Sequence, residues 1–246
     1  MSGPVTARNN VTDTTSITSN HCVNQLVAAP EREPLRARAR KELVEFGRRA
    51  YRAGLIPGLS GNLSVRVAPG EIWVTPSGVN KGFLAESDLI AVDEGGNLLY
   101  SNGNRPTSET PMHTEIYRVR PDVGSVCHTH APYATAFAVA GLDLSEPILP
   151  EVIISIGPIP LIPYATPTTQ EVARAVSEVM KTYQAGLLAN HGVITVGRTL
   201  AEAYARMETV ESLARVVAIS RALGRVNALS PAEVEKLLAL VNGHGM

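Results

Sequence analysis

The sequence has few cysteines, no long apolar run and almost no net charge. Its 246 residues include two cysteines, Cys22 and Cys127, which are too few and too differently placed for a disulfide framework. No uninterrupted apolar stretch approaches the roughly 20 residues that a membrane-spanning helix needs. The formal net charge of −1 gives no electrostatic basis for binding nucleic acid or an anionic membrane surface. These absences favour a water-soluble protein in a reducing compartment, with Cys127 buried as a free thiol.

The N-terminal segment lacks both a secretory signal and hydrophobic periodicity. Residues 1 to about 30 are rich in Thr, Asn and Ser, and contain no charged region followed by an apolar core. Such a composition buries too little apolar surface to order itself. We therefore expect a disordered or loosely ordered tail over residues 1–33, a single domain over residues 34–246, and a cytoplasmic location.

Apolar periodicity predicts helices near both ends of the chain and between runs of short strands. The helices are expected over residues 35–52, 109–120 (capped by Ser108), 133–140, 169–183 (capped by Thr168 or Thr169), 200–223 and from Pro231 onward. The strands are expected over residues 63–67, 72–75, 89–92, 123–130, 186–190 and 193–196, with irregular short strands in 151–165. Strict strand–helix alternation is missing, so an antiparallel or mixed sheet with helices on both faces is preferred.

The run Val126-Cys127-His128-Thr129-His130 contains two histidines two residues apart. In a strand, this spacing places both side chains on the same face. Imidazole suits zinc and similar divalent ions, so His128 and His130 are candidate ligands of one metal. A pair of ordinary core or surface histidines is the alternative.

Glu109 and His191 are the further candidates for this site. Glu109 opens a predicted helix, where the helix dipole stabilises a carboxylate, and His191 lies before Gly192, which allows a close turn. Three histidines and a carboxylate would form a catalytic zinc site with positions open to substrate. His113, one helical turn after Glu109, is expected to support the site or the core rather than bind metal. Each residue taken alone is also compatible with a purely structural role.

Three polar turns share a composition that suits anion binding. They are Ser60-Gly61-Asn62, Thr75-Pro76-Ser77-Gly78 and Thr107-Ser108. Each offers backbone N–H groups together with a hydroxyl or an amide, and Ser108 at a helix start would add the helix dipole for a phosphate. Ordinary turns remain the alternative for each.

These motifs occur in an order that resembles one family. The series Gly61-Asn62-Leu63-Ser64-Val65-Arg66, Thr75-Pro76-Ser77-Gly78, Pro106-Thr107-Ser108-Glu109, His128-Thr129-His130 and Asn190-His191-Gly192 is similar to the class II aldolase/adducin family. That family includes L-fuculose-phosphate aldolase and L-ribulose-5-phosphate 4-epimerase. The resemblance covers about residues 35–240. It implies a three-layer α/β/α fold around a central, mainly antiparallel sheet, and a homotetramer with active sites near subunit boundaries.

The resemblance also implies roles for individual residues. The metal would be Zn²⁺, or another divalent ion such as Mn²⁺ or Co²⁺, bound by Glu109, His128, His130 and His191. Glu109 would become the acid/base once substrate displaces it from the metal. The phosphate of the substrate would be held by Gly61, Asn62, Ser77, Gly78, Thr107 and Ser108.

The activity so implied is that of a zinc-dependent aldehyde-lyase acting on a small phosphorylated sugar or hydroxyketone through a stabilised enediolate. A sugar-acid-phosphate decarboxylase, a methylthioribulose-phosphate-type dehydratase, a pentose-phosphate 4-epimerase and a non-catalytic adducin-type module are the alternatives. Glutamate at position 109 disfavours the epimerase, which carries aspartate there, and adducin-like domains lack the metal histidines. The aldolases use a tyrosine acid in the connection after the metal strand, whereas here that connection reads Leu149-Pro150-Glu151-Val152, with no tyrosine from there until Tyr164. Glu151 falls where the dehydratases carry an acid/base.

Overall fold

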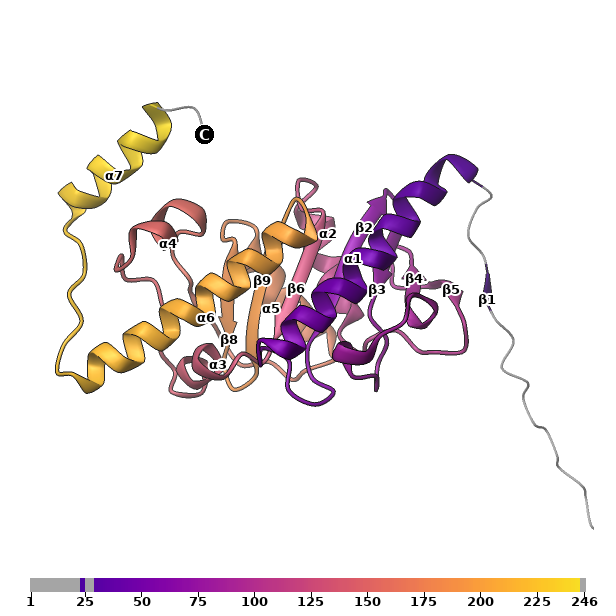
Figure 1. Ribbon diagram of the computed structural model, residues 1–246, viewed down its shortest axis with the longest axis horizontal. Coiled ribbons are helices and arrows are strands. Elements are labelled where there is room, and N and C mark those ends of the chain that lie inside the picture. Colours follow the sequence, from indigo (N-terminus) through magenta and orange to yellow (C-terminus); the bar gives the residue numbers. More distant parts are fainter. Residues whose placement is uncertain (1–22, 25–28, 244–246) are drawn as a thin grey trace, which may run out of the picture.

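A nine-stranded sheet forms the middle layer of the computed structural model, which describes residues 23–24 and 29–243 (Figure 1). The strand order is β1-β5-β4-β3-β2-β6-β9-β8-β7. Neighbouring strands are antiparallel except for the parallel pair β7–β8 at one edge. The strands are β1 (Val23–Asn24), β2 (Asn62–Ala68), β3 (Glu71–Val74), β4 (Ile90–Val92), β5 (Leu98–Ser101), β6 (Ser125–Thr129), β7 (Leu161–Ile162), β8 (Ala185–Leu188) and β9 (Gly192–Gly197).

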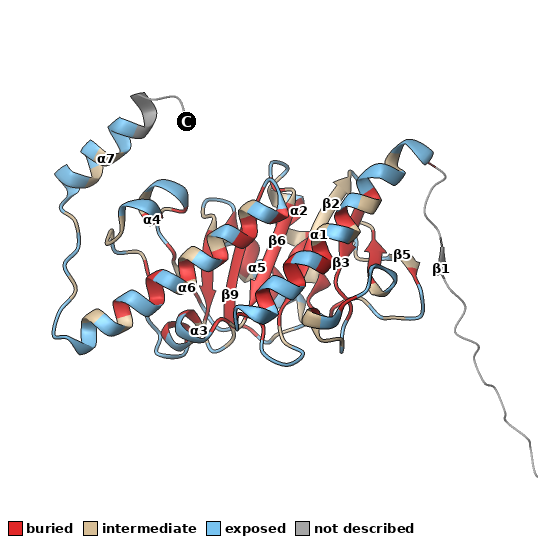
Figure 2. Ribbon diagram, viewed as in Figure 1, coloured by how far each residue is buried: buried red, intermediate tan, exposed pale blue. Residues whose placement is uncertain are grey.

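Helices cover both faces of the sheet. The helices are α1 (Glu33–Arg52), α2 (Thr110–Val119), α3 (Pro132–Val139), α4 (Pro150–Ser155), α5 (Gln170–Met180), α6 (Leu200–Ala222) and α7 (Pro231–Gly243). Helices α1, α3 and α6 cover one face and α2 and α5 the other, whereas α4 packs on α6, and α7 packs on α4 and stands away from the sheet (Figure 1). Alternate strand residues point to opposite layers: Trp73 packs in the core with α1 and α6, whereas Ile72 and Val74 pack with α2 and α5. The buried strands thus lie between helices, as Figure 2 shows. The predicted three-layer α/β/α fold with a mainly antiparallel sheet is confirmed.

Three local predictions are wrong. The stretch expected to hold irregular strands begins with the helix α4, because Pro150 occupies a first helical position, where its missing N–H costs nothing. Ser108 does not cap α2: Glu109 is the N-cap residue, and no side chain makes the capping hydrogen bond. Strand β5 was not predicted, although the turn that leads into it was.

Part of the predicted N-terminal tail is described. Val23 and Asn24 pair with Ser101 and Tyr100 of β5. A 3-10 turn over Pro30–Arg32 leads directly into α1. The rest of the predicted tail, residues 1–22 and 25–28, lies outside the described residues. None of the described helices is long and apolar enough to cross a membrane.

Candidate metal centre

Strand register brings the candidate ligands to one end of the sheet. His128 lies on β6 with Val126, which faces the α2–α5 layer, while Cys127 between them packs in the α1–α6 layer. His130 follows β6 by one residue, and His191 lies in the turn between β8 and β9. Glu109 immediately precedes α2. Residues from three segments therefore meet where β6 ends and β9 begins.

The three imidazoles form a nearly equilateral cluster. Their ring centroids are 5.1 Å apart for His128–His130, 4.8 Å for His128–His191 and 5.0 Å for His130–His191. One potential ligand atom from each residue lies within 4.8 Å of the others. The carboxylate joins the cluster, with Glu109 Oε2 at 3.2 Å from His128 Nε2 and Oε1 at 3.1 Å from His191 Nε2.

The donor set fits a divalent cation. His128 Nδ1 donates to the carbonyl of Val193 at 2.9 Å, so an imidazole with this single N–H has its lone pair on Nε2. That lone pair faces both the Glu109 carboxylate and His130 Nε2, at 3.2 Å in each case. Within the described part of the chain, Glu109 Oε1 is buried without a hydrogen bond. Electron-rich atoms that converge in this way are stabilised by a metal ion between them.

The charge states of the cluster also suit a metal. Burial, and then the charges of His128 and His191, lower the pKa of His130 to about 4, so its ring is neutral at neutral pH. Burial acts to raise the pKa of Glu109, but the interactions with His128 and His191 outweigh it and hold that pKa below its ordinary value. Neutral imidazoles and an ionised carboxylate are the forms that bind metal.

Two glycines allow the chain to pass close to the cluster. A Cβ atom on Gly192 would lie 2.5 Å from the carbonyl oxygen of Thr129 and 3.0 Å from Cδ2 of His130. Gly61 has a φ of +66°, and a Cβ there would lie 2.9 Å from the carbonyl oxygen of His128. Side chains at these positions would push the ligand-bearing segments apart.

Backbone hydrogen bonds tie the three polar turns together. Thr107 N donates to the carbonyl of Thr75 at 3.2 Å, and Ser77 N donates to that of Arg105 at 3.0 Å. The first turn joins them because Leu63 N donates to Thr75 Oγ1 at 3.2 Å. The turns thereby line one cavity of about 250 Å³ beside the metal cluster, which contains all six residues predicted to hold phosphate: Gly61, Asn62, Ser77, Gly78, Thr107 and Ser108.

Lys81 is a lining residue that the sequence analysis missed. Its Nζ donates to the carbonyl of Leu59 at 3.0 Å, and its side chain is buried in the wall of the cavity. Burial lowers the pKa of Lys81 to about 8, while the negative charge of Glu109 opposes that shift. The sequence places Lys81 three residues after the turn Thr75-Pro76-Ser77-Gly78, which could have indicated a role in the cavity. A lysine in a loop is usually exposed to solvent, however, so its burial was not expected.

The surroundings of Asn62 and Glu151 bear on the roles considered for them. The Asn62 side chain is buried and donates to Glu109 Oε2 at 2.7 Å, so its amide is engaged with the carboxylate. Glu151 is exposed on α4 and lines a separate hollow with residues of α6, including Glu208 and Thr209. Within one chain, Glu151 therefore lies outside the metal cavity.

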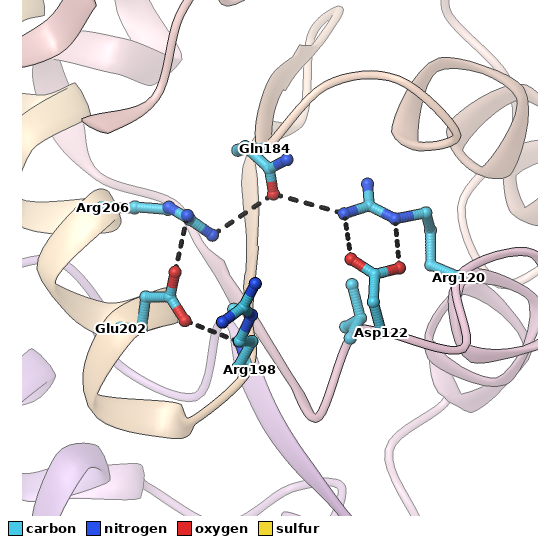
Figure 3. Close-up of a pocket in the computed structure, with 8 residues that line it drawn as sticks. Arg120, Asp122, Gln184, Arg198, Glu202 and Arg206 are labelled. Carbon is cyan, nitrogen blue, oxygen red and sulfur yellow. Dashed lines mark hydrogen bonds and ion pairs between the residues drawn. The ribbon is translucent and has the colours of Figure 1, made fainter. Parts of the chain in front are cut away.

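A second polar pocket lies at the opposite ends of β6 and β9 and contains none of the predicted site residues (Figure 3). Its charged groups pair with one another: Arg120 bonds Asp122 at 2.7 Å, and Arg206 bonds Glu202 at 2.6 Å. Gln184 accepts from both arginines, as Figure 3 shows. This pocket is an internal ion-pair network that ties α6 to the strand ends.

Fold and site together define a class of proteins. Residues 41–218 match the family model described as Class II Aldolase and Adducin N-terminal domain. The chain belongs to this family, which confirms the resemblance noted in the sequence.

Relatives of known name divide between two reactions. The chain is 36% identical over 183 residues to the 3-oxo-tetronate 4-phosphate decarboxylase of Haemophilus influenzae, covering 72% of this chain and 86% of the relative. It is also 36% identical over 176 residues to the L-fuculose phosphate aldolase of Methanococcus vannielii, covering 72% and 93%. The crystal structure of YgbL from Klebsiella pneumoniae, a candidate aldolase, epimerase or decarboxylase, matches with a TM-score of 0.76 at 31% identity, covering 82% of this chain and 98% of YgbL.

Proposed function

We propose that the protein is a metal-dependent aldolase that cleaves or forms a carbon–carbon bond of a phosphorylated ketose. One observation carries the proposal. The Glu109 carboxylate lies 3.1 and 3.2 Å from Nε2 of His191 and His128, at the wall of a cavity lined by hydroxyl and backbone N–H groups. A base, a cation site and an anion site thus lie side by side, as retro-aldol chemistry on a sugar phosphate requires.

His128, His130, His191 and Glu109 would hold the metal, with Zn²⁺ favoured over Mn²⁺ or Co²⁺ by the three imidazoles. When bound, the ion supplies Lewis-acid stabilisation of the negative charge that develops on the substrate oxygens. Glu109 lies at the wall of the cavity, where its carboxylate would take the proton from the carbon next to the substrate carbonyl.

The polar turns would hold the other end of the substrate. Gly61, Ser77, Gly78, Thr107 and Ser108 line the cavity with hydroxyl groups and glycines, which suit a phosphate, while Ser77 N and Thr107 N already donate to main-chain carbonyls. The Lys81 ammonium group would balance part of the phosphate charge. Holding the phosphate in this cavity would orient the carbonyl carbon of the substrate toward Glu109.

Decarboxylation of a sugar-acid phosphate is the second candidate. It is favoured by relatives named 3-oxo-tetronate 4-phosphate decarboxylase, whose identity to this chain equals that of the aldolases. Among the described residues, the cavity lining contains no tyrosine to act as the acid of the aldolases, and Tyr164 is 60% exposed. Loss of carbon dioxide also forms a carbanion beside a carbonyl, so the same metal ligands would serve it. The dehydratase alternative is disfavoured because Glu151 of the same chain is exposed and lies outside the metal cavity. The adducin-type module is disfavoured because all three histidines are present.

Two further proposals follow from family membership. The protein would act on a small phosphorylated substrate, and it would assemble as a homotetramer. Sedimentation analysis of the purified chain tests the assembly.

A substrate panel tests the function. The zinc-loaded protein is incubated with phosphorylated ketoses and with 3-oxo sugar-acid phosphates, and released aldehyde and carbon dioxide are measured. Aldehyde from a ketose phosphate supports the aldolase, whereas carbon dioxide from a 3-oxo acid phosphate supports the decarboxylase. Glu109→Gln is the matched control. The absence of both products from the metal-loaded protein across the panel would overturn both candidates.

A further inference from the structure

A chain of buried polar side chains runs from Glu109 into the layer between the sheet and α2. Asn62 Nδ2 lies 2.7 Å from Glu109 Oε2, and Asn62 Oδ1 lies 2.5 Å from His113 Nε2. On its other side, His113 Nδ1 lies 2.7 Å from Ser64 Oγ, which lies 2.7 Å from the hydroxyl of Tyr117. Two residues of β2 and two of α2 therefore link the predicted base to the core.

The chain is sealed from solvent. His113 and Ser64 are 0% exposed, Tyr117 is 1%, Asn62 is 3% and Glu109 is 8% exposed. In such surroundings a hydrogen bond is strengthened by the low dielectric, and a polar group that loses its partner is costly. Each member of the chain is therefore held in one arrangement by its neighbours.

The carboxylate sets the direction of every hydrogen bond. Ionised Glu109 can only accept, so Asn62 must present its NH₂ group to it and its carbonyl to His113. His113 then donates through Nε2, and its Nδ1 accepts the hydroxyl hydrogen of Ser64. Tyr117 donates in turn to Ser64 Oγ. Burial lowers the pKa of His113 to about 3, so the ring is neutral, with one donor and one acceptor as this arrangement requires.

We propose that His113 is a positioning residue for Glu109 and acts through Asn62. Its Nε2–H requires the Asn62 carbonyl as its acceptor, which fixes the amide in the orientation that donates to Glu109 Oε2. A flipped amide would present its oxygen to the carboxylate and repel it. Asn62 thereby holds Oε2 of Glu109, while Oε1 lies toward the histidine cluster, 3.1 Å from His191 Nε2. The inference rests on the proposed function in that Glu109 serves as ligand and base.

A double-mutant cycle tests this relationship. The variants are His113→Leu, Asn62→Ala and the two combined, and the readouts are kcat and the Zn²⁺ dissociation constant measured against a competing chelator. His113→Leu alone is expected to lower kcat and to weaken zinc binding by about 10- to 100-fold, the usual effect of losing a residue that orients a metal ligand. Added to Asn62→Ala, His113→Leu is expected to change neither value further, because the connection is already broken.

Matched variants separate positioning from general loss of packing. His113→Gln keeps a donor toward Asn62 and should recover most of kcat. Ser64→Ala should lower kcat because the tautomer of His113 is no longer fixed. Ser125→Ala removes a buried strand hydroxyl that has no hydrogen-bond partner among the described residues, and should leave kcat unchanged.

Two results would overturn the inference: additive effects of His113→Leu and Asn62→Ala on both readouts, or equal losses in Ser64→Ala and Ser125→Ala. Failure of the proposed function gives a different result. If no substrate in the panel is turned over, the zinc dissociation constants alone complete the cycle. Non-additive effects of the His113 and Asn62 substitutions on zinc affinity would then support the positioning role, although the aldolase and decarboxylase proposals would be rejected.

Discussion

Asn62 and His128 lie directly opposite each other in the β2–β6 ladder, and both reach the same carboxylate oxygen. Asn62 Nδ2 is 2.7 Å and His128 Nε2 is 3.2 Å from Glu109 Oε2. A slip of one residue in either strand would turn the side chain that it contributes to the opposite face of the sheet. The register of two central strands therefore determines the surroundings of Glu109.

His128→Ala is expected to abolish metal binding. The wild-type protein should carry about one divalent ion per chain after zinc loading and desalting, and the variant close to none, because a three-histidine site loses a ligand from its buried side. Elemental analysis measures the ratio. Cys127→Ala is the control, since its thiol is also a zinc-binding group but packs in the opposite layer. Equal loss of metal in Cys127→Ala would contradict the assignment.

Glu109→Gln should keep the fold and lose the base. The amide has nearly the same shape as the carboxylate but cannot accept a proton, so exchange of the substrate α-proton with D₂O should slow by about 10²- to 10⁴-fold. Proton NMR of the substrate follows the exchange, and circular dichroism checks the fold. An exchange rate equal to that of the wild type would assign the base elsewhere.

Gly192→Ala should disturb the metal cluster. The new Cβ would meet the Thr129 carbonyl at 2.5 Å, a backbone atom that cannot turn aside. We expect a stability loss of about 1–3 kcal/mol and weaker zinc binding. Gly186→Ala on the neighbouring strand is the control, because its Cβ would meet the flexible side chain of Ile162 at 2.8 Å. Calorimetry and chelator competition separate the two effects, and unchanged zinc affinity in Gly192→Ala would contradict the prediction.

Glu71→Gln should destabilise the fold far from the metal. Glu71 accepts from Arg36 at 2.7 and 2.9 Å and from Trp73 Nε1 at 3.0 Å, and this pairing ties α1 to β3. Removing one charge of a buried pair costs about 3–5 kcal/mol, whereas Glu42→Gln in the more exposed pair with Arg38 should cost less than about 1 kcal/mol. Urea unfolding measures both, and equal losses would contradict the prediction.

Glu71→Gln should also change how the stability of the protein depends on pH at acidic pH. Burial acts to raise the pKa of Glu71, but the hydrogen bonds from Arg36 and Trp73 outweigh it and hold the pKa below its ordinary 4.5. The contribution of Glu71 is therefore present above the unfolded pKa and is lost as pH falls through the lower folded value. Wild type and Glu71→Gln should approach each other in stability below about pH 4.5.

Lys81→Met should stabilise the metal-free protein at neutral pH. The folded pKa of Lys81 is lowered from 10.5 to about 8, so between these values the unfolded chain binds more protons than the folded one. The free energy of unfolding of the wild type therefore rises as pH increases from about 8 to 10.5. The variant has no lysine at this position and should not show this rise. The gain at pH 7 is on the order of 1–3 kcal/mol. Urea unfolding across this pH range checks the prediction, and parallel pH profiles would contradict it.

Local periodicity predicted much of the fold and the pairing of His128 with His130, whereas Glu109 and His191 were placed with them through their positions at a helix start and a turn and through the order of the family motifs. Alternation around Val126-Cys127-His128 assigns faces of the sheet, and the spacing of His128 and His130 places two imidazoles together. The engagement of Asn62 with Glu109 and the burial of Lys81 depend on contacts between segments far apart in the chain, which periodicity does not encode. Helix α4 was not predicted because its apolar β-branched residues are also typical of a strand. Its sequence signal is Pro150, since proline is favoured in the first turn of a helix.

The polar turns around the cavity are joined through main-chain atoms: Thr107 N to Thr75 O, Ser77 N to Arg105 O, and the bridge between Pro76 and Pro106. Their frame thus survives replacement of the side chains that point into the cavity. Variation at Ser77 and Ser108 should therefore yield folded, metal-loaded proteins with altered substrate preference. The main-chain frame would stay fixed while the lining side chains vary, which makes this chain a suitable scaffold for directed evolution of substrate preference.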